Sequence, residues 1–197
     1  FNKAIEYINK AIKLYSEVDE RYYEAESYAL SLRGDIYFAD GKTKKAEADY
    51  LKAIELSPKY NNIYFNLVNY YIKMKDFNSA IKTIDKVIEM DYDDPEGYYK
   101  KAVAFKNEKK YLKAITFVSN SILKFEENEV KKGDYTISNI NNKDNVSLSE
   151  LYLFRAELSS NLGNETFACE DRKKALFKSK NEKERKELDA VIADNCN

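Results

Sequence analysis

The sequence predicts an all-α fold, in which antiparallel helix pairs stack into a solenoid. Small and large apolar residues recur with a period of about 34 residues. Within each period they follow helical spacing on two successive segments. A single helix pair cannot bury its large side chains alone, so neighbouring pairs must stack. The three copies carry Leu30, Gly34, Tyr37, Ala46, Tyr50 and Ala53, then Tyr64, Val68, Tyr71, Ala80, Ile84 and Val87, then Tyr98, Ala102, Phe105, Ala114, Val118 and Ser121.

The alternation of small and large residues predicts close helix packing. Two antiparallel helices approach closely only where one presents a small side chain, such as Gly34 or Ala46, and the other a large one. Tyr37, Tyr71 and Phe105 are the recurring rings, and each can bury about 150–250 Å². We therefore expect each repeat to be one helix hairpin whose large side chains are covered by the neighbouring repeats.

Residues 1–14 resemble the second helix of a leading pair. Ala4 and Ile8 fall where Ala46 and Tyr50 fall later in the chain. The first helix of this pair is missing, so we expect the sequence to be part of a longer protein.

Residues 15–128 are predicted to hold three full repeats. The first contains a surplus stretch without Gly or Pro, which predicts a first helix from about Asp19 to Ala39, capped by Ser16 or Asp19. An extended solvated linker is the alternative. Asp94 is expected to cap a helix opened by Pro95, because proline suits the first helical position. The other helices are expected at 42–58, 61–75, 77–91, 95–107 and 110–127.

A polar, Asn-rich insertion follows at 129–148. It contains few residues that could join a core, so we expect a loop over most of its length. A helix extension to about Lys132 would precede it. Such loops are either binding elements or disordered, and the sequence leaves both open. Ser147 with Glu150 forms a capping box that starts the fourth repeat, 149–181. Residues 182–197 are expected to form a capping helix with Leu188, Val191 and Ile192 on one face.

Composition argues against several function classes. The chain has 33 basic and 34 acidic residues and a net charge of -1, so it lacks the basic surplus that nucleic-acid binding requires. It has no histidine, which removes the commonest zinc ligand and general base. No glycine-rich phosphate loop and no membrane-spanning apolar run occur. We expect no cofactor, no metal and no catalysis, and paired acids such as Glu47 and Asp49 are expected to lie on solvated faces.

This repeat resembles the tetratricopeptide repeat family over about four fifths of the chain. The resemblance implies a right-handed superhelix with a C-terminal capping helix, and a scaffold whose first helices line a concave groove for a peptide or partner protein. Ordinary solvated helix faces are the alternative for any of these residues. By position, the groove would be lined by Tyr28, Ser31, Asp35 and Phe38, by Asn62, Phe65, Asn66 and Asn69, and by Glu96, Tyr99, Lys100, Val103 and Lys106.

One subclass of the family is disfavoured. Co-chaperones that resemble this fold hold a C-terminal carboxylate with Lys and Asn in one first helix, Asn in the next, and Lys and Arg in the third. The corresponding positions here are Ser31, Asp35, Asn66, Glu96 and Lys100. A carboxylate would therefore meet Asp35 and Glu96, two like charges.

The two cysteines, Cys169 and Cys196, are expected to pair. They lie at about equal distances from the turn expected near residues 179–182, so a helix hairpin would bring them together. A buried, unpaired Cys169 is the alternative. A disulfide implies an oxidising compartment, such as the periplasm or cell envelope, and free thiols would fit the cytoplasm. The text ACEDRKKAL followed by a C-terminal Cys also resembles the last repeat of envelope tetratricopeptide proteins of the Bacteroidetes.

These observations predict a non-catalytic scaffold that binds a peptide or partner protein in the concave groove. Two alternatives remain. The chain could be an accessory or regulatory module of a larger enzyme or sensor protein, or a module for self-association.

Overall fold

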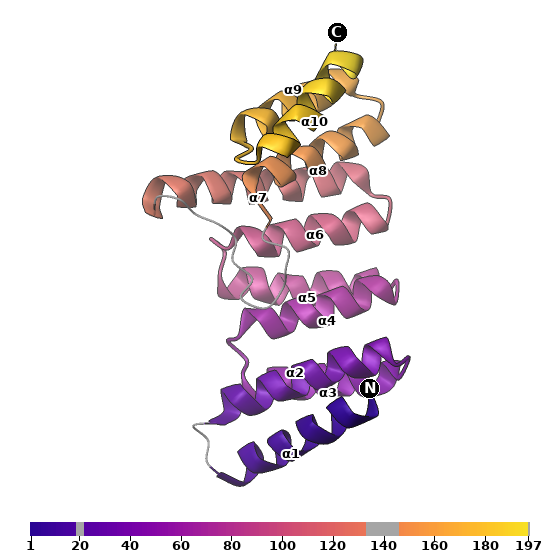
Figure 1. Cartoon of the computed structure of the whole chain (residues 1–197), viewed down its shortest axis with the longest axis vertical. Coiled ribbons are helices and arrows are strands. Elements are labelled where there is room, and N and C mark those ends of the chain that lie inside the picture. The colour runs from indigo at the N-terminus through magenta and orange to yellow at the C-terminus, as the bar shows by residue number, and fades with distance from the viewer. Residues whose placement is uncertain (19–21, 133–145, 197) are drawn as a thin grey trace. The chain divides into compact units, whose positions relative to one another are not determined.

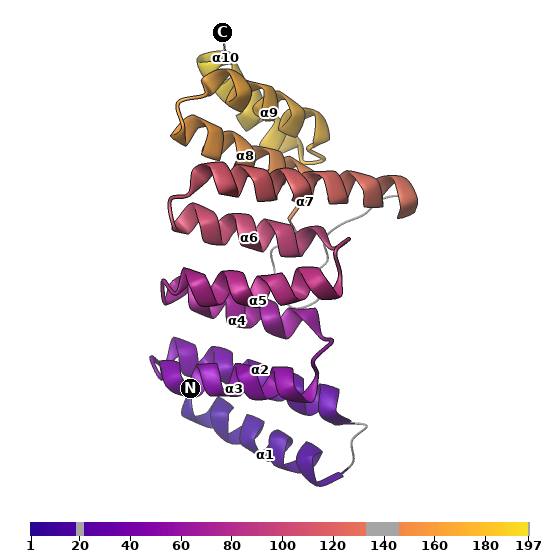
Figure 2. The ribbon, with the colours of Figure 1, turned by 180° about the vertical axis from the view of Figure 1, so that it is seen from behind.

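The computed structural model describes residues 1–18, 22–132 and 146–196, and these residues form ten α-helices without any β-strand. The predicted all-α fold is therefore confirmed. The chain forms two compact units, residues 1–90 and 91–197. Figures 1 and 2 show each unit as a series of helix hairpins.

The first unit begins with one helix and continues with two hairpins. Helices α2 and α3 form one antiparallel hairpin, and α4 and α5 form the next (Figure 1). Helix α1 packs on α2, and α3 packs on α4. The helices are α1 (Asn2–Val18), α2 (Tyr23–Ala39), α3 (Thr43–Leu56), α4 (Asn61–Lys73) and α5 (Phe77–Met90).

The second unit contains two hairpins and a final helix. Helices α6 and α7 pair, α8 and α9 pair, and α7 packs on α8 (Figure 2). Helix α10 packs on α9, the place expected for a capping helix. The helices are α6 (Pro95–Asn107), α7 (Tyr111–Lys132), α8 (Leu148–Asn161), α9 (Glu165–Lys178) and α10 (Glu182–Asn195).

Small residues lie at the contacts inside each hairpin, as the periodicity predicts. Ala46, Ala80 and Ala114, which open the second helix of three successive repeats, are each 0% exposed. Gly34 of α2 lies against the ring of Tyr50 of α3, so the predicted small and large partners meet in the first repeat.

The same turn joins the two helices of all four hairpins. Its left-handed residue is Gly41, Lys75, Lys109 or Gly163, with φ of 74°, 61°, 61° and 75°. The next residue donates its backbone N–H to a carbonyl near the end of the first helix, which closes a Schellman-type cap. These bonds are Lys42 to Tyr37 (2.8 Å), Asp76 to Tyr71, Lys110 to Phe105 and Asn164 to Ser159 (2.9 Å each).

Two predicted caps are present. Asp94 accepts a hydrogen bond from the backbone N–H of Glu96, and Pro95 is the first residue of α6. Ser147 and Glu150 form the reciprocal capping box at the start of α8. Both sequence signals therefore place these helix starts correctly.

The predicted start of the first full repeat is wrong. Helix α1 continues to Val18, and α2 begins only at Tyr23, so the surplus residues are shared between the two helices. Ser16 lies inside α1 and donates to the carbonyl of Lys13, so it caps nothing. Asp19 lies outside the described residues. The reason is that the stretch has helix-forming residues throughout and α1 can lengthen as easily as α2.

The helix extension predicted before the polar insertion is confirmed, because α7 ends at Lys132. Residues 129–132 belong to α7, and 133–145 lie outside the described residues. In α10 the predicted apolar face is only partly covered. Leu188 is buried, whereas Val191 is 42% exposed.

Candidate functional site

In the first unit, the predicted groove residues of α2 lie along one helix face. Tyr28, Ser31, Asp35 and Phe38 follow each other at intervals of three or four residues. Tyr28 is 44% exposed and Ser31 is buried. Phe38 is partly buried, with its ring edge-on to Tyr70 of α4 at 5.3 Å between centroids.

The neighbouring helix α4 carries a stripe of amides. Asn62, Asn66 and Asn69 are each partly buried and lie at helical spacing. Asn66 donates from Nδ2 to Oγ of Ser31 at 2.9 Å, which ties α4 to α2. Among the described residues, Asn62 and Asn69 make no side-chain hydrogen bond. Their amides are therefore available to bond the backbone of a bound chain.

Phe65 was predicted to line the groove, and this is wrong. It is 2% exposed and packs with Tyr64 and with Val87 of α5. Ser31, at the same place in the preceding repeat, is also buried. The register position faces the interior in both repeats, because its side chain points between helices rather than along the outer edge of the first helix.

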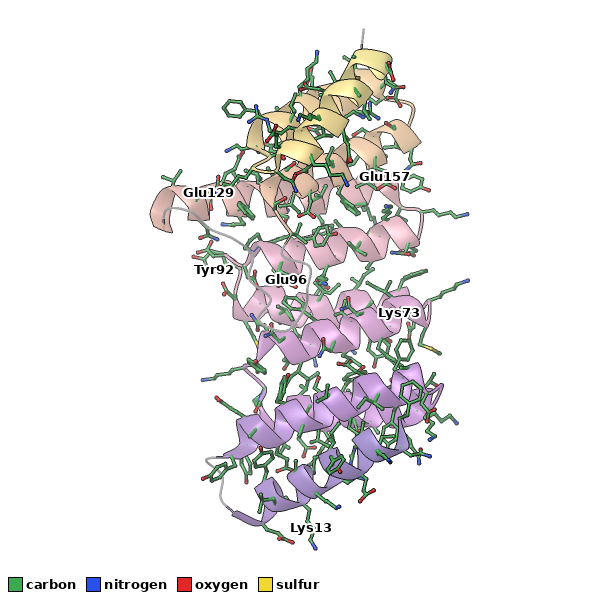
Figure 3. The ribbon with its side chains drawn as sticks, viewed as in Figure 1. Lys13, Lys73, Tyr92, Glu96, Glu129 and Glu157 are labelled. Atoms are coloured by element: carbon green, nitrogen blue, oxygen red, sulfur yellow. A yellow bond between two sulfur atoms is a disulfide. The ribbon has the colours of Figure 1, made fainter. Side chains whose placement is uncertain are left out.

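Asp35 is held by the second helix of its own repeat. The hydroxyl of Tyr50 donates to Oδ1 of Asp35 at 2.6 Å. Burial of the carboxyl raises its pKa and outweighs the hydrogen bond and the attraction of Lys73, although the residue as a whole is exposed. Lys73, labelled in Figure 3, lies 5.3 Å from the centre of the Phe38 ring. This end of the face thus combines a carboxyl, a ring and a cation.

In the second unit, the predicted residues of α6 contact α8. The ring of Tyr99 lies edge-on to Phe154 at 5.4 Å. Lys106 pairs at 2.6 Å with Glu157, which is labelled in Figure 3, and its ammonium group lies 4.9 Å from the Phe154 ring centre. Val103 is partly buried. The first helices α6 and α8 are therefore joined by rings and one ion pair.

Glu96, near the start of α6, is a buried acid (Figure 3). Burial raises its pKa to about 7, helped by nearby Asp94 and opposed by Lys100. Lys100 lies 3.9 Å from the Glu96 carboxylate, one turn further along α6. The carboxylate of a bound peptide would lie next to a buried acid whose negatively charged form is already disfavoured.

Sequence reasoning missed one recurring contact. Arg33 of α2 binds both carboxylate oxygens of Asp49 at 2.7 Å, and Arg155 of α8 binds both of Asp171 at 2.7 and 2.8 Å. The signal was present in the sequence, because Arg and Asp stand 16 residues apart in both repeats. The notable fact is that Asp49 and Asp171 are buried, whereas paired acids such as Glu47 and Asp49 were expected on solvated faces.

Cys169 of α9 and Cys196, which directly follows α10, form a disulfide with a Cα–Cα distance of 5.5 Å. The bond links the end of the capping helix to the helix it covers. No helix among the described residues has the length and apolar character needed to cross a membrane. The same described residues contain no group of three acidic or cysteine side chains placed to hold a metal ion.

The repeated hairpins, their shared turn and the polar faces of their first helices define a helical-repeat protein. Residues 34–74 match a family model described as "TPR repeat", and residues 62–94 match one described as "Tetratricopeptide repeat". These matches indicate tetratricopeptide repeats over residues 34–94 of the chain. The chain is 33% identical over 95 residues to human "Tetratricopeptide repeat protein 6", a match that covers 48% of this chain and 15% of that protein.

Solved structures share the fold at low sequence identity. "Crystal structure of MamA" matches with a TM-score of 0.59 and 19% identity, over 87% of this chain and 88% of that one. The structure from the functional characterisation of PilF of Pseudomonas aeruginosa matches with a TM-score of 0.60 and 16% identity, over 84% and 68%. The first TPR of Spaghetti (RPAP3), bound to the HSP90 peptide SRMEEVD, matches with a TM-score of 0.51 and 17% identity, over 71% and 95%.

Proposed function

We propose that this chain is a non-catalytic scaffold that binds an extended peptide segment of a partner protein on the α2–α4 face. The observation that carries the proposal is the pair of amides on α4. Asn62 and Asn69 are partly buried and make no hydrogen bond among the described residues. Each amide offers both a donor and an acceptor, which suits the backbone of an extended chain.

Aromatic contact area supports the same function. Tyr28 on α2 is 44% exposed, and a tyrosine ring provides contact area at low entropic cost. The face is also preorganised, because the Asn66–Ser31 and Tyr50–Asp35 hydrogen bonds hold its two helices and its carboxyl group. Preorganisation lowers the entropic cost of binding.

The ligand is expected to differ from that of the RPAP3 repeat. Ser31 and Asp35 stand where a carboxylate clamp would need a lysine and an asparagine, and both are already engaged by Asn66 and Tyr50. We therefore expect the peptide SRMEEVD to show no saturable binding to this chain in a fluorescence anisotropy titration. Saturable binding that is lost on Asp35→Ala would contradict this part of the proposal.

The proposal is tested by selecting peptides from a display library against the whole chain and measuring their affinity for variants. Asn62→Ala combined with Asn69→Ala is expected to weaken binding by about tenfold or more, since each lost hydrogen bond contributes roughly 0.5–1.5 kcal/mol. Asn78→Ala, an exposed asparagine on α5, is the matched control and should leave binding unchanged. If both variants lose affinity for the peptide to the same extent, or if neither does, the binding surface lies elsewhere.

A role as an accessory module of a larger protein is the second candidate. The observation that favours it is the match to human tetratricopeptide repeat protein 6, of which this chain covers only 15%. The full-length reading frame decides it. A catalytic domain in the same polypeptide would make this chain the part that recruits or positions a partner.

A further inference from the structure

In the first repeat, an arginine fills the space between two successive second helices. Arg33 of α2 binds Asp49 of α3 through Nε and Nη2, each at 2.7 Å, and its Nη1 donates to Oδ1 of Asn9 of α1 at 2.6 Å. The ring of Tyr37 lies 5.7 Å from the guanidinium carbon. We call this arrangement the outer clasp.

The second unit contains the same outer clasp at the same register. Arg155 of α8 binds Asp171 of α9 through Nε and Nη2, and its Nη1 donates to Oγ of Ser119 of α7 at 2.9 Å. The α6–α7 hairpin also has a cation at this register, because Lys101 lies 4.3 Å from the ring centre of Phe117. In three of the four hairpins, the first helix therefore carries a cation at the register of Arg33.

The α4–α5 hairpin has no cation at this position. The periodicity places Leu67 where Arg33 stands, Thr83 where Asp49 stands, and Leu51 of α3 where Asn9 stands. These side chains are too short to fill the space of the outer clasp. A hollow of about 240 Å³ lies here, between α3, α4 and α5, lined by these three residues together with Ile54, Tyr64 and Tyr71 among others.

The hollow has an apolar floor and a basic wall. Leu67 and Tyr64 are 2% and 6% exposed, and Leu51 at the rim is 49% exposed. Lys82 and Lys86 of α5 line the same hollow, one helical turn apart. Both lysines are exposed, and neither has an ion-pair partner among the described residues. Tyr71, which also lines the hollow, donates its hydroxyl to the carboxylate of Glu47 of α3 at 2.9 Å.

We propose that this hollow binds an amphipathic helix of a partner protein that inserts one leucine- or phenylalanine-sized side chain and presents two carboxylates one turn apart. The volume suits a single side chain of this size, and the apolar floor favours its burial. Lys82 and Lys86 have the one-turn spacing that carboxylates on a helix present, which gives charge complementarity. The hollow shares no residue with the α2–α4 face, so it is a second docking surface.

The probe is a synthetic alanine-based helical peptide with one central leucine and two glutamates about one turn apart. Two matched peptides serve as controls, one with leucine replaced by alanine and one with both glutamates replaced by lysines. Binding to the whole chain is followed by fluorescence anisotropy at low salt, and the contact is mapped by the backbone NMR shifts of Leu51 and Thr83. The low-salt condition retains the contribution of the exposed lysines.

Two variants test the two halves of the proposal. K82E with K86E reverses the basic wall and should weaken the leucine–glutamate peptide about tenfold while improving the lysine peptide. L51N, L67R and T83D together copy the outer clasp of the first repeat into the hollow and should abolish binding, because arginine then fills the space. Circular dichroism and thermal denaturation check that each variant is folded.

The expected result is that the leucine–glutamate peptide binds the wild-type chain more tightly than both control peptides. The proposal is overturned if the leucine-to-alanine peptide binds equally well, or if K82E with K86E leaves all three affinities unchanged. Should the triple variant fail to fold, the double variant alone decides, because Lys82 and Lys86 are exposed. Binding that is lost on Asn62→Ala with Asn69→Ala would instead place the peptide on the α2–α4 face.

Discussion

The ring of Tyr50 occupies the space that a side chain at Gly34 would need. A Cβ atom built on Gly34 would lie 2.8 Å from Cε1 and 3.0 Å from Cδ1 of Tyr50, closer than carbon atoms pack. The same tyrosine is 1% exposed and donates to Asp35, so it cannot move aside without breaking a hydrogen bond. The approach of α2 and α3 therefore depends on the absence of a side chain at residue 34.

Gly34→Ala is expected to lower the free energy of unfolding by about 1–3 kcal/mol, the usual cost of overpacking a core. The measurement is urea denaturation followed by circular dichroism. Its sign is informative, because alanine in an unconstrained helix would stabilise by roughly 0.5–1 kcal/mol. A more stable Gly34→Ala variant would show that α2 and α3 are not in the contact described.

Lys75→Gly and Lys109→Gly are each expected to stabilise the chain by about 1 kcal/mol. Both lysines have a φ of 61°, a left-handed conformation that costs a residue with a Cβ roughly 1–2 kcal/mol and costs glycine almost nothing. Thermal denaturation measures the gain. Lys52→Gly, inside α3, is the control and should be destabilising by about 1 kcal/mol. The prediction fails if all three variants lose stability to the same extent.

Arg155→Ala is expected to destabilise the chain by about 3–5 kcal/mol, because it leaves the carboxylate of Asp171 buried without its partner. The side chain of Asp171 is 0% exposed. Arg155→Leu combined with Asp171→Thr copies the α4–α5 hairpin and should recover most of the loss, since no charge is then buried. A double-mutant cycle by urea denaturation measures the coupling. Near-zero coupling would mean that the outer clasp contributes little to stability.

Stability is expected to fall as the pH rises through 7, because of Glu96. Its pKa in the folded chain is about 7, against an ordinary value of 4.5, so the native state binds more protons between these values. The stabilisation that protonated Glu96 gives to the folded chain is fully present below about pH 4.5 and is lost above about pH 7. Glu96→Gln should stabilise the chain at pH 8 by on the order of 2 kcal/mol and flatten this dependence. Denaturation of both proteins across the pH range checks it, and parallel curves would contradict it.

Cys169→Ser combined with Cys196→Ser is expected to cost about 3–4 kcal/mol on the chain-entropy model, given the 27-residue separation of the two cysteines. Reduction of the wild-type chain should cause a similar loss, and reductant should leave the double variant unchanged. Mass spectrometry of the native protein under non-reducing conditions should find no free thiol. Two free thiols would remove the argument for an oxidising compartment.

The candidate site could be predicted only in part from the sequence. Counting from the repeat placed Asn62, Asn66 and Asn69 on one helix face, and the amides do lie there. The same counting included Phe65, which is buried against Val87. Exposure at this register is decided by the neighbouring helix rather than by the helix that carries the residue, and periodicity within one helix contains no such information.

The outer clasp and its absence from the α4–α5 hairpin show a second limit. The spacing of Arg33 and Asp49 is visible in the sequence, but equal spacing of opposite charges also occurs on solvated faces. Only their burial and mutual distances distinguish the two cases. The hollow over Leu67 is likewise invisible in the sequence, because a leucine in a helix says nothing of the volume left beside it.

The sequence by itself determined the helix hairpins and the helix caps at Asp94 and Ser147. These features depend on contacts between residues close along the chain, on the conformations that glycine and proline favour, and on a repeat that displays its small and large residues in the same order each time. The tertiary structure decided which polar residues face solvent, where a carboxylate is buried, and where one hairpin leaves a hollow. Those properties depend on side chains that meet from different helices, and the local pattern of any one helix does not contain them.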